Sequence, residues 1–210
     1  MRRFFAIVLN DARVNRNTIA LLLIAIPCIA IFGPMLGLRR MQTEAMLLAL
    51  GGFVGPVMFP YWVVGMDRMK GPMHLLVGLP ISRFGIVQAK AFGAVLLSCV
   101  LTVIAILCAM SIGLMDPAQA RVALAFAPVL MIAACTASTA VYFLFPARGA
   151  TIIVAGFIAI SAPFFDPLLD KLVHVGALVL VAAYVGAGVV ALVALYVAER
   201  LWSRRASPCE

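Results

Sequence analysis

Six long runs of apolar residues dominate the chain, and short polar stretches separate them. A helix that crosses a bilayer needs about 20 apolar residues, because it rises about 1.5 Å per residue through a core about 30 Å thick. The runs therefore predict six membrane-spanning helices. Their expected bounds are residues 18–38, 45–66, 84–115, 122–145, 150–165 and 175–198.

The fifth run is shorter than the others, and proline punctuates its far end. Pro163 and Pro167 fall where this run gives way to charged residues, and proline breaks a helix because it lacks the N–H donor. We expect a short kinked or re-entrant piece after this span. Such a piece must be covered by protein, because its backbone groups would otherwise face lipid.

Residues 2–17 precede the first run and show helical spacing of polar and apolar positions. At about 100° per residue, Arg3, Asn10 and Arg13 fall on one side. The other side collects the apolar residues Phe4, Phe5, Val8, Leu9 and Ala12. Asp11 is the exception to this pattern. We predict an amphipathic helix at the inner membrane interface. A cleavable signal peptide fits less well, because no small-residue cleavage site follows the short apolar core.

The composition excludes a water-soluble globule. Of the 210 residues, 65% are hydrophobic and 11% are charged, whereas soluble domains are about 45–50% apolar and about 25% charged. The polar loops are too short to hold a soluble domain. We therefore expect residues 1–210 to form a single all-α transmembrane domain.

The positive charges give the spans an orientation. The formal net charge is +8, and Lys and Arg in membrane proteins collect on cytoplasmic loops. With the N-terminus inside, twelve of the sixteen Lys and Arg residues lie on the inner side. The outer loops keep Arg39, Arg40, Arg121 and Lys171. This bias places both termini, the loop at residues 67–83 and the tail at residues 199–210 in the cytoplasm.

The sequence carries no pattern typical of a catalytic or metal site. Its five cysteines show no C-x-x-C spacing, and we interpret them as buried hydrophobic residues. His74 and His174 lie in loops, and neither G-x-S-x-G nor H-E-x-x-H occurs. The sequence also lacks a P-loop. Any ATP that drives the protein must therefore bind to another chain.

The predicted spans are almost free of ionisable side chains. The exception is Lys90, about two turns into the third span, and we expect its long side chain to extend back to the inner interface. Carboxylates within a membrane mark ion and proton pathways. Their absence from the six runs argues against a proton- or sodium-coupled transporter and against an ion channel with a charged filter.

The longest polar interruption, residues 66–90, lies between the second and third spans. Gly71-Pro72 opens a short apolar segment and Gly78-Leu79-Pro80 closes it, which is typical punctuation of a short helix. Ser82 then stands where the N-cap of the third span belongs. From these residues alone, the segment could be a docking helix or an interfacial loop.

The run G-L-P-I-S-R-F-G-I-V-Q-A-K at residues 78–90 resembles a pattern in ABC-2 type transporter permeases. The matching positions are Leu79, Pro80, Ile81, Ser82, Arg83, Ile86, Val87 and Lys90. Asp67, Gly71 and the pair Leu75-Leu76 resemble the acidic residue, glycine and leucines that lead into that pattern. The layout is similar as well, with an N-terminal interfacial helix, six spans, a broken fifth helix and both ends inside.

The resemblance implies a type V exporter-like architecture, in which the loop between spans 2 and 3 forms a cytoplasmic coupling helix. The implied coupling residues are Asp67, Arg68, Gly71, Leu75, Leu76, Leu79, Pro80, Ser82, Arg83 and Lys90. The implied partners are two ATP-binding subunits that hold ATP and Mg, a second permease copy or a homologous permease, and membrane lipids. This chain is expected to bind no cofactor and no nucleic acid. The implied location is the bacterial plasma (inner) membrane.

The spans offer only apolar groups and scattered hydroxyls to a transport pathway. The candidate lumen-lining residues are Ser98, Thr102, Thr136, Thr139 and Tyr142. Such walls suit an amphipathic or hydrophobic cargo, such as a peptide, a drug-like molecule or a lipid-like compound. We expect a transport subunit of an ATP-driven exporter and not an enzyme. A membrane-embedded substrate-binding subunit of a vitamin importer and a structural or lipid-modifying membrane protein are the alternatives.

Overall fold

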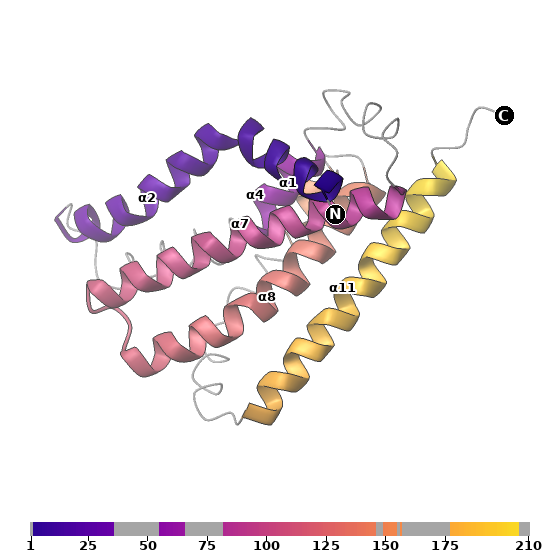
Figure 1. The fold of residues 1–210 in the computed structure, drawn as a ribbon. Helices are drawn as coiled ribbons and strands as arrows, with labels where there is room; N and C mark the ends of the chain where they lie inside the picture. Colours follow the sequence, from indigo (N-terminus) through magenta and orange to yellow (C-terminus); the bar gives the residue numbers. More distant parts are fainter. Residues whose placement is uncertain are drawn as a thin grey trace.

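The fold is a bundle of long helices (Figure 1). The computed structural model describes residues 2–35, 55–65, 82–145, 149–154, 156 and 177–205. In this part of the chain every regular element is helical. The elements are α1 (Arg2–Val14), α2 (Arg16–Met35), α4 (Gly55–Pro60), the π-helical turn η2 (Tyr61–Gly65), α7 (Arg83–Ser111), α8 (Pro117–Leu144) and α11 (Ala177–Arg205).

Four of the described helices are long and apolar enough to cross a membrane. They cover Arg16–Gly33, Arg83–Ser111, Pro117–Leu144 and Leu178–Trp202. This finding confirms the all-α membrane protein expected from the composition. Of the second predicted span only residues 55–65 are described, and of the fifth only residues 150–154 and 156, which are helical. The remainder of both spans lies outside the described residues.

The helix ends differ from the predicted span ends where local chemistry sets them. Helix α8 starts at Pro117, ahead of the predicted residue 122, because proline suits the first helical position. The amide of Asp116, the N-cap, donates to the side chain of Gln119 at 3.3 Å. Helix α11 continues to Arg205, so the predicted tail that starts at residue 199 begins as helix.

The turn between α7 and α8 is fixed by a glycine. Gly113 has a φ of 68°, a left-handed conformation that glycine adopts without steric cost. Its amide donates to the carbonyl of Met110 at 3.0 Å, and the amide of Leu114 donates to that of Ala109 at 2.9 Å. This is the Schellman arrangement that ends a helix. It explains why α7 stops at Ser111, before the predicted residue 115.

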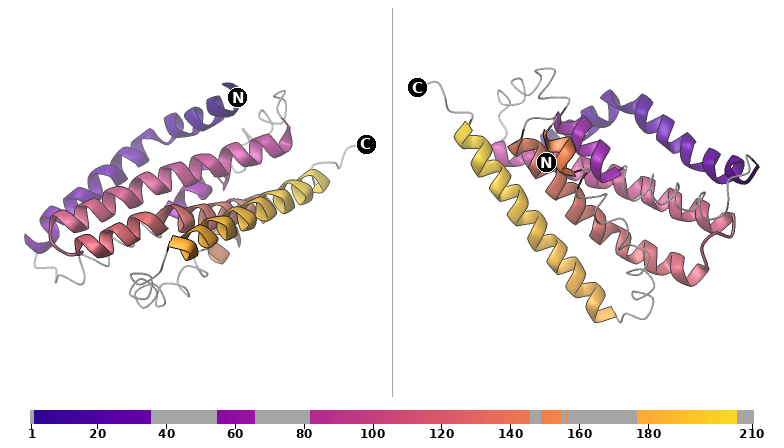
Figure 2. Two further views of the ribbon diagram at one scale, coloured as in Figure 1. Left: turned by 60° about the horizontal axis from the view of Figure 1, so that its bottom comes forward. Right: turned by 180° about the vertical axis from the view of Figure 1, so that it is seen from behind.

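Helix α7 is the centre of the bundle. It packs against α1, α2, α4, α8 and α11, and α8 packs in turn against α4 and α11. Figure 2 shows α2, α7, α8 and α11 as neighbours in that order. One core cluster joins α2, α4, α7 and α8, and a second joins η2, α7, α8 and α11. In the second cluster the ring centroids of Phe143 and Trp202 lie 5.3 Å apart.

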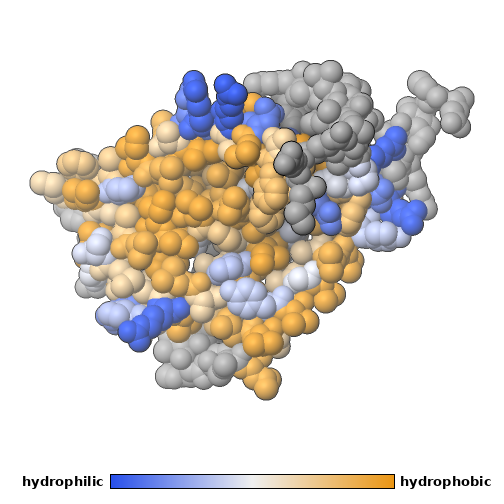
Figure 3. Space-filling model, in the orientation of Figure 1, coloured by the Kyte–Doolittle hydropathy of each residue, from blue (hydrophilic) through white to orange (hydrophobic). Residues whose placement is uncertain are grey.

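The outer surface of the bundle is apolar, as a lipid-facing surface must be. Figure 3 shows hydrophobic residues over most of one face, with hydrophilic residues along the upper edge, at the right and at the lower left. Helices α2 and α11 expose many large apolar side chains. Among the most exposed are Leu21, Ile24, Met35, Leu178, Val181 and Val185. These two helices therefore present large apolar side chains at the outer surface, where lipid can cover them.

Helices α4, α7 and α8 meet at a contact between small residues. A Cβ atom added to Gly55 would lie 2.9 Å from Ser98 Oγ and 3.3 Å from Ser98 Cα. The thiol of Cys135 donates to the same Oγ at 3.2 Å. Small residues allow such close approach of membrane helices. The contact therefore sets the distance between α4 and α7.

Replacement of Gly55 tests this contact. Because the added methyl group meets backbone as well as side chain, Gly55→Ala should lower the free energy of unfolding by about 1–3 kcal/mol. Equilibrium unfolding in mixed micelles measures the change. The matched control is Gly188→Ala in α11, where an added Cβ meets nothing within 4 Å. Equal effects of the two substitutions would contradict a tight contact at Gly55.

Candidate functional site

The candidate functional site is the base of the predicted cytoplasmic loop, where the chain enters α7. The residues 66–81 lie outside the described residues. This range contains the predicted coupling residues Asp67, Arg68, Gly71, Leu75, Leu76, Leu79 and Pro80. The structure describes the two sides of this loop, which are η2 before it and Ser82 after it. It also describes Arg83 and Lys90.

Ser82 is the N-cap of α7, as predicted from the sequence. Its backbone is extended, with φ −60° and ψ 146°. Its Oγ accepts a hydrogen bond from the amide of Gly85 at 3.0 Å. This bond satisfies one of the amides that the first turn of a helix leaves without a partner. The loop therefore passes into α7 at a defined point, and Arg83 is the first residue of the helix.

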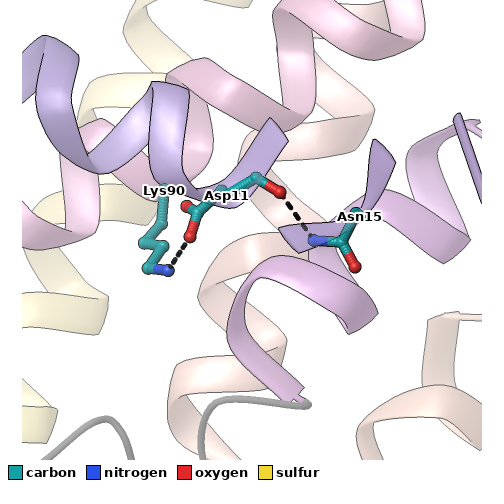
Figure 4. A network of polar contacts seen from close by, with 3 residues as sticks. All are labelled: Asp11, Asn15 and Lys90. Atoms are coloured by element: carbon teal, nitrogen blue, oxygen red, sulfur yellow. Dashed lines mark hydrogen bonds and ion pairs between the residues drawn. The ribbon is translucent and has the colours of Figure 1, made fainter. Parts of the chain in front are cut away.

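Lys90 forms a buried ion pair with Asp11 of α1 (Figure 4). Lys90 Nζ lies 2.6 Å from Asp11 Oδ1, and the two side chains are 1% and 7% exposed. The expectation that Lys90 extends back to the aqueous interface is therefore wrong. Its ammonium group is held inside the protein, because a carboxylate on the neighbouring helix supplies the opposite charge.

Asp11 belongs to the face of α1 that packs on α7. Phe4, Ile7, Val8 and Asp11 follow the spacing i, i+3, i+4 and i+7 of a single helical face. Three of them are buried and Phe4 is half-buried. Their partners on α7 are Ile86, Ala89, Lys90 and Phe92. Asp11 is thus no exception to the amphipathic pattern, because its charge is neutralised at this interface.

The backbone around Asp11 is fixed by Asn15, which forms the corner between α1 and α2. The Asn15 side chain donates to the Asp11 carbonyl at 2.9 Å (Figure 4), and the Asn15 amide donates to the same carbonyl at 3.1 Å. The Asn15 carbonyl accepts the amides of Thr18 and Ile19, at 3.1 and 3.0 Å. The chain therefore passes from α1 into α2 through a hydrogen-bonded turn next to the ion pair.

The other side of the loop is anchored by η2. Pro60 lies in α4 directly before the π-helical turn, and its missing N–H disturbs the regular helical hydrogen bonding. Val63 and Val64 are fully buried and pack in the cluster that includes Val87 of α7. The ring centroid of Tyr61 lies 5.9 Å from the ring centroid of Tyr142 in α8. Both sides of the loop are thus fixed to the packed bundle.

The five candidate lumen-lining residues are packed between helices. Ser98, Thr102, Thr136, Thr139 and Tyr142 are each at most 8% exposed. Thr102 donates to the carbonyl of Ser98 at 2.8 Å, and the Tyr142 and Thr151 hydroxyls lie 3.1 Å apart. Their role in a transport pathway stays a prediction. Among the described residues no group of His, Cys, Asp or Glu side chains could hold a metal ion.

Sequence reasoning missed Asp11 and Asn15 as parts of this site. The available signal was the presence of two opposite charges at positions where the hydropathy pattern predicts apolar residues. One carboxylate lay on the apolar side of an amphipathic helix, and one lysine lay inside a span. Two opposite charges that are each costly to bury alone are candidates for a pair. The sequence did not show that α1 folds back onto the start of α7.

Replacing the two charges separately and together tests the ion pair. Asp11→Leu or Lys90→Met alone removes one charge of a buried ion pair and keeps the other buried, and each should lower the free energy of unfolding by about 3–5 kcal/mol. The double variant Asp11→Leu/Lys90→Met should recover most of this loss, because neither charge is then buried. A double-mutant cycle in mixed micelles measures the coupling. Additive losses would show that the two side chains do not interact.

Comparison with known families agrees with the local pattern. The sequence from residue 6 to residue 201 matches the family described as ABC-2 family transporter protein. No curated protein and no solved structure matches the chain. The matched range includes most of α1, the whole loop, and α7, α8 and nearly all of α11. The predicted family is thereby confirmed, and the chain belongs to the ABC-2 family of transporter proteins.

Proposed function

We propose that this chain is the membrane-spanning permease subunit of an ATP-driven exporter of amphipathic or hydrophobic cargo. As an ABC-2 family protein it is an integral membrane transport subunit, and the family implies pairing with an ATP-binding subunit. The observation that carries the proposal is the family match over residues 6–201, together with a loop whose two sides are anchored to the bundle. The match favours a permease over a subunit of a vitamin importer.

The proposed architecture has six spans, an N-terminal interfacial helix and a coupling helix within residues 67–83. Supporting this view, the corner between α1 and α2, the start of α7 and the ends of α8 and α11 all lie toward one end of the bundle (Figure 1). Exposed Arg13, Arg16 and Arg200 belong to these segments. Because Lys and Arg collect on the cytoplasmic side, we propose that this end and both termini face the cytoplasm, and that the membrane is a bacterial inner membrane.

The proposed mechanism is mechanical coupling through the loop. Two ATP-binding subunits, which hold ATP and Mg, would close on nucleotide and displace the loops of two paired permease copies. Displacement of an anchored loop moves the helices to which it is anchored, here η2 and α7. Since α7 contacts most of the other described helices, its tilt would convert an inward-open bundle into an outward-open one. The bundle is thus a two-state element biased by the partner's nucleotide.

The proposed cargo class follows from the chemistry of the spans. Residues 17–35, 91–111 and 122–144 contain no Asp, Glu, Lys, Arg or His. The charges of Lys90 and Asp11 neutralise each other within the protein. A pathway between such helices offers hydroxyl and apolar groups, which suit a peptide, a drug-like molecule or a lipid-like compound.

Reconstitution with a candidate ATP-binding subunit tests the function. The complex should co-purify, and Leu75→Ala/Leu76→Ala should weaken association about 30-fold, because truncation of central interface residues costs about 2 kcal/mol. Co-purification and ATP hydrolysis in nanodiscs measure the effect. Leu178→Ala is the control, since Leu178 is 82% exposed on α11. If the wild-type chain neither binds an ATP-binding subunit nor alters its ATP hydrolysis, the permease assignment fails.

A further inference from the structure

Helix α1 is attached to α7 by contacts of two kinds. Apolar contacts join Ile7 and Val8 to Ile86 and Ala89. The ring centroids of Phe4 and Phe92 lie 5.7 Å apart. A Cβ atom added at Gly93 would lie 3.7 Å from Val8 Cγ1. The ion pair between Asp11 and Lys90 adds an electrostatic contact at 2.6 Å. Together they form an interface that the proposed coupling mechanism does not use.

The two kinds of contact resist different movements. Apolar side chains attract one another without a directional preference, so only the fit of their shapes resists sliding of one helix along the other. A buried ion pair holds one relative position, because sliding separates opposite charges in a medium of low dielectric constant. Setting the register between packed segments is the best-supported use of buried polar groups. The ion pair therefore fixes where α1 sits along α7.

The ion pair lies close to the loop that the ATP-binding subunits are proposed to displace. Lys90 follows the N-cap Ser82 by eight residues, which is about 12 Å along a helix that rises 1.5 Å per residue. Asp11 is hydrogen-bonded through its carbonyl to Asn15, and α2 begins at the next residue. A continuous series of contacts thus leads from the loop through the first turns of α7 to α1 and the start of α2.

We propose that Asp11 and Lys90 are positioning residues that make α1 and the first half of α7 one rigid body throughout the transport cycle. The inference rests on the proposed function, and it adds a role for two residues. Nucleotide-driven displacement of the loop would then move α1 together with α7. Without the ion pair, α1 would slip on the apolar contacts while α7 moves.

Spin-label distances test the rigid body without knowledge of the cargo. In a chain whose five native cysteines are replaced, labels at Leu9→Cys and Leu96→Cys report the distance between α1 and α7. Both side chains are exposed, at 68% and 47%. Labels at Leu96→Cys and Val189→Cys report α7 against α11. The complex with its ATP-binding subunit is compared without nucleotide and after trapping with ATP and vanadate.

The two label pairs separate failure of the inference from failure of the function. In the wild-type background, the α7–α11 distance should change on trapping and the α1–α7 distance should not. An α7–α11 distance that is the same without nucleotide and after trapping would overturn the proposed function, and the inference with it. A changed α1–α7 distance beside a changed α7–α11 distance would overturn the inference alone.

The double variant Asp11→Leu/Lys90→Met shows whether the ion pair holds the two helices together. This variant is expected to recover most of the lost stability, so a purely structural role predicts no further change. The inference predicts that its α1–α7 distance shifts or broadens on trapping, while α7 still moves against α11. If the α1–α7 distance stays fixed in the double variant, the ion pair has no positioning role.

A disulfide between the same helices gives an independent functional readout. Val8→Cys/Gly93→Cys places two thiols within reach of each other, given the 3.7 Å contact. Because a rigid interface tolerates a cross-link, the oxidised complex should hydrolyse ATP within about twofold of the reduced complex. The difference in activation free energy would then be under about 0.5 kcal/mol. Hydrolysis that stops on oxidation and returns with a reductant would mean that α1 must leave α7, which overturns the inference.

Discussion

The ion pair between Asp11 and Lys90 is the contact on which the packing of α1 against α7 depends. A lysine two turns into a membrane-spanning helix can avoid an isolated buried charge by reaching water or by meeting a carboxylate. Here it meets a carboxylate from α1, and both side chains are buried. This pairing requires α1 to lie against α7. The charge inside α7 therefore helps to fix the position of the N-terminal helix, together with the apolar contacts around it.

Helix α7 connects this end of the molecule to the rest. Its first turns carry Ser82 as the cap and Lys90 as the anchor of α1. Its middle carries Ser98, which contacts Gly55 of α4 and Cys135 of α8. Small and hydroxyl-bearing residues at these points let three helices approach closely. A bundle built around one central helix is suited to respond as a whole when the loop before that helix is displaced.

Several features of the fold were predictable because they depend on neighbouring residues. The long apolar runs predicted spanning helices, and four are found among the described residues. The serine before Arg83 predicted the N-cap of α7, and residues 78–90 predicted the ABC-2 family. Lys90 and Asp11 were each interpreted wrongly, as a side chain that reaches water and as an exception on an apolar face. Each interpretation considered one helix alone, whereas the two charges are 79 positions apart in the sequence.

The sequence by itself determined that this chain is helical, lies in a membrane and carries a basic, punctuated loop between its second and third apolar runs. These properties follow from hydrophobicity, helix length and capping, which act within about 20 residues. Only the tertiary structure decided that α1 packs on α7, that Gly55 meets Ser98, and that Lys90 is neutralised by Asp11. The reason is physical. Burial and charge pairing depend on which helices become neighbours, and many arrangements of equally apolar helices satisfy the same hydropathy pattern.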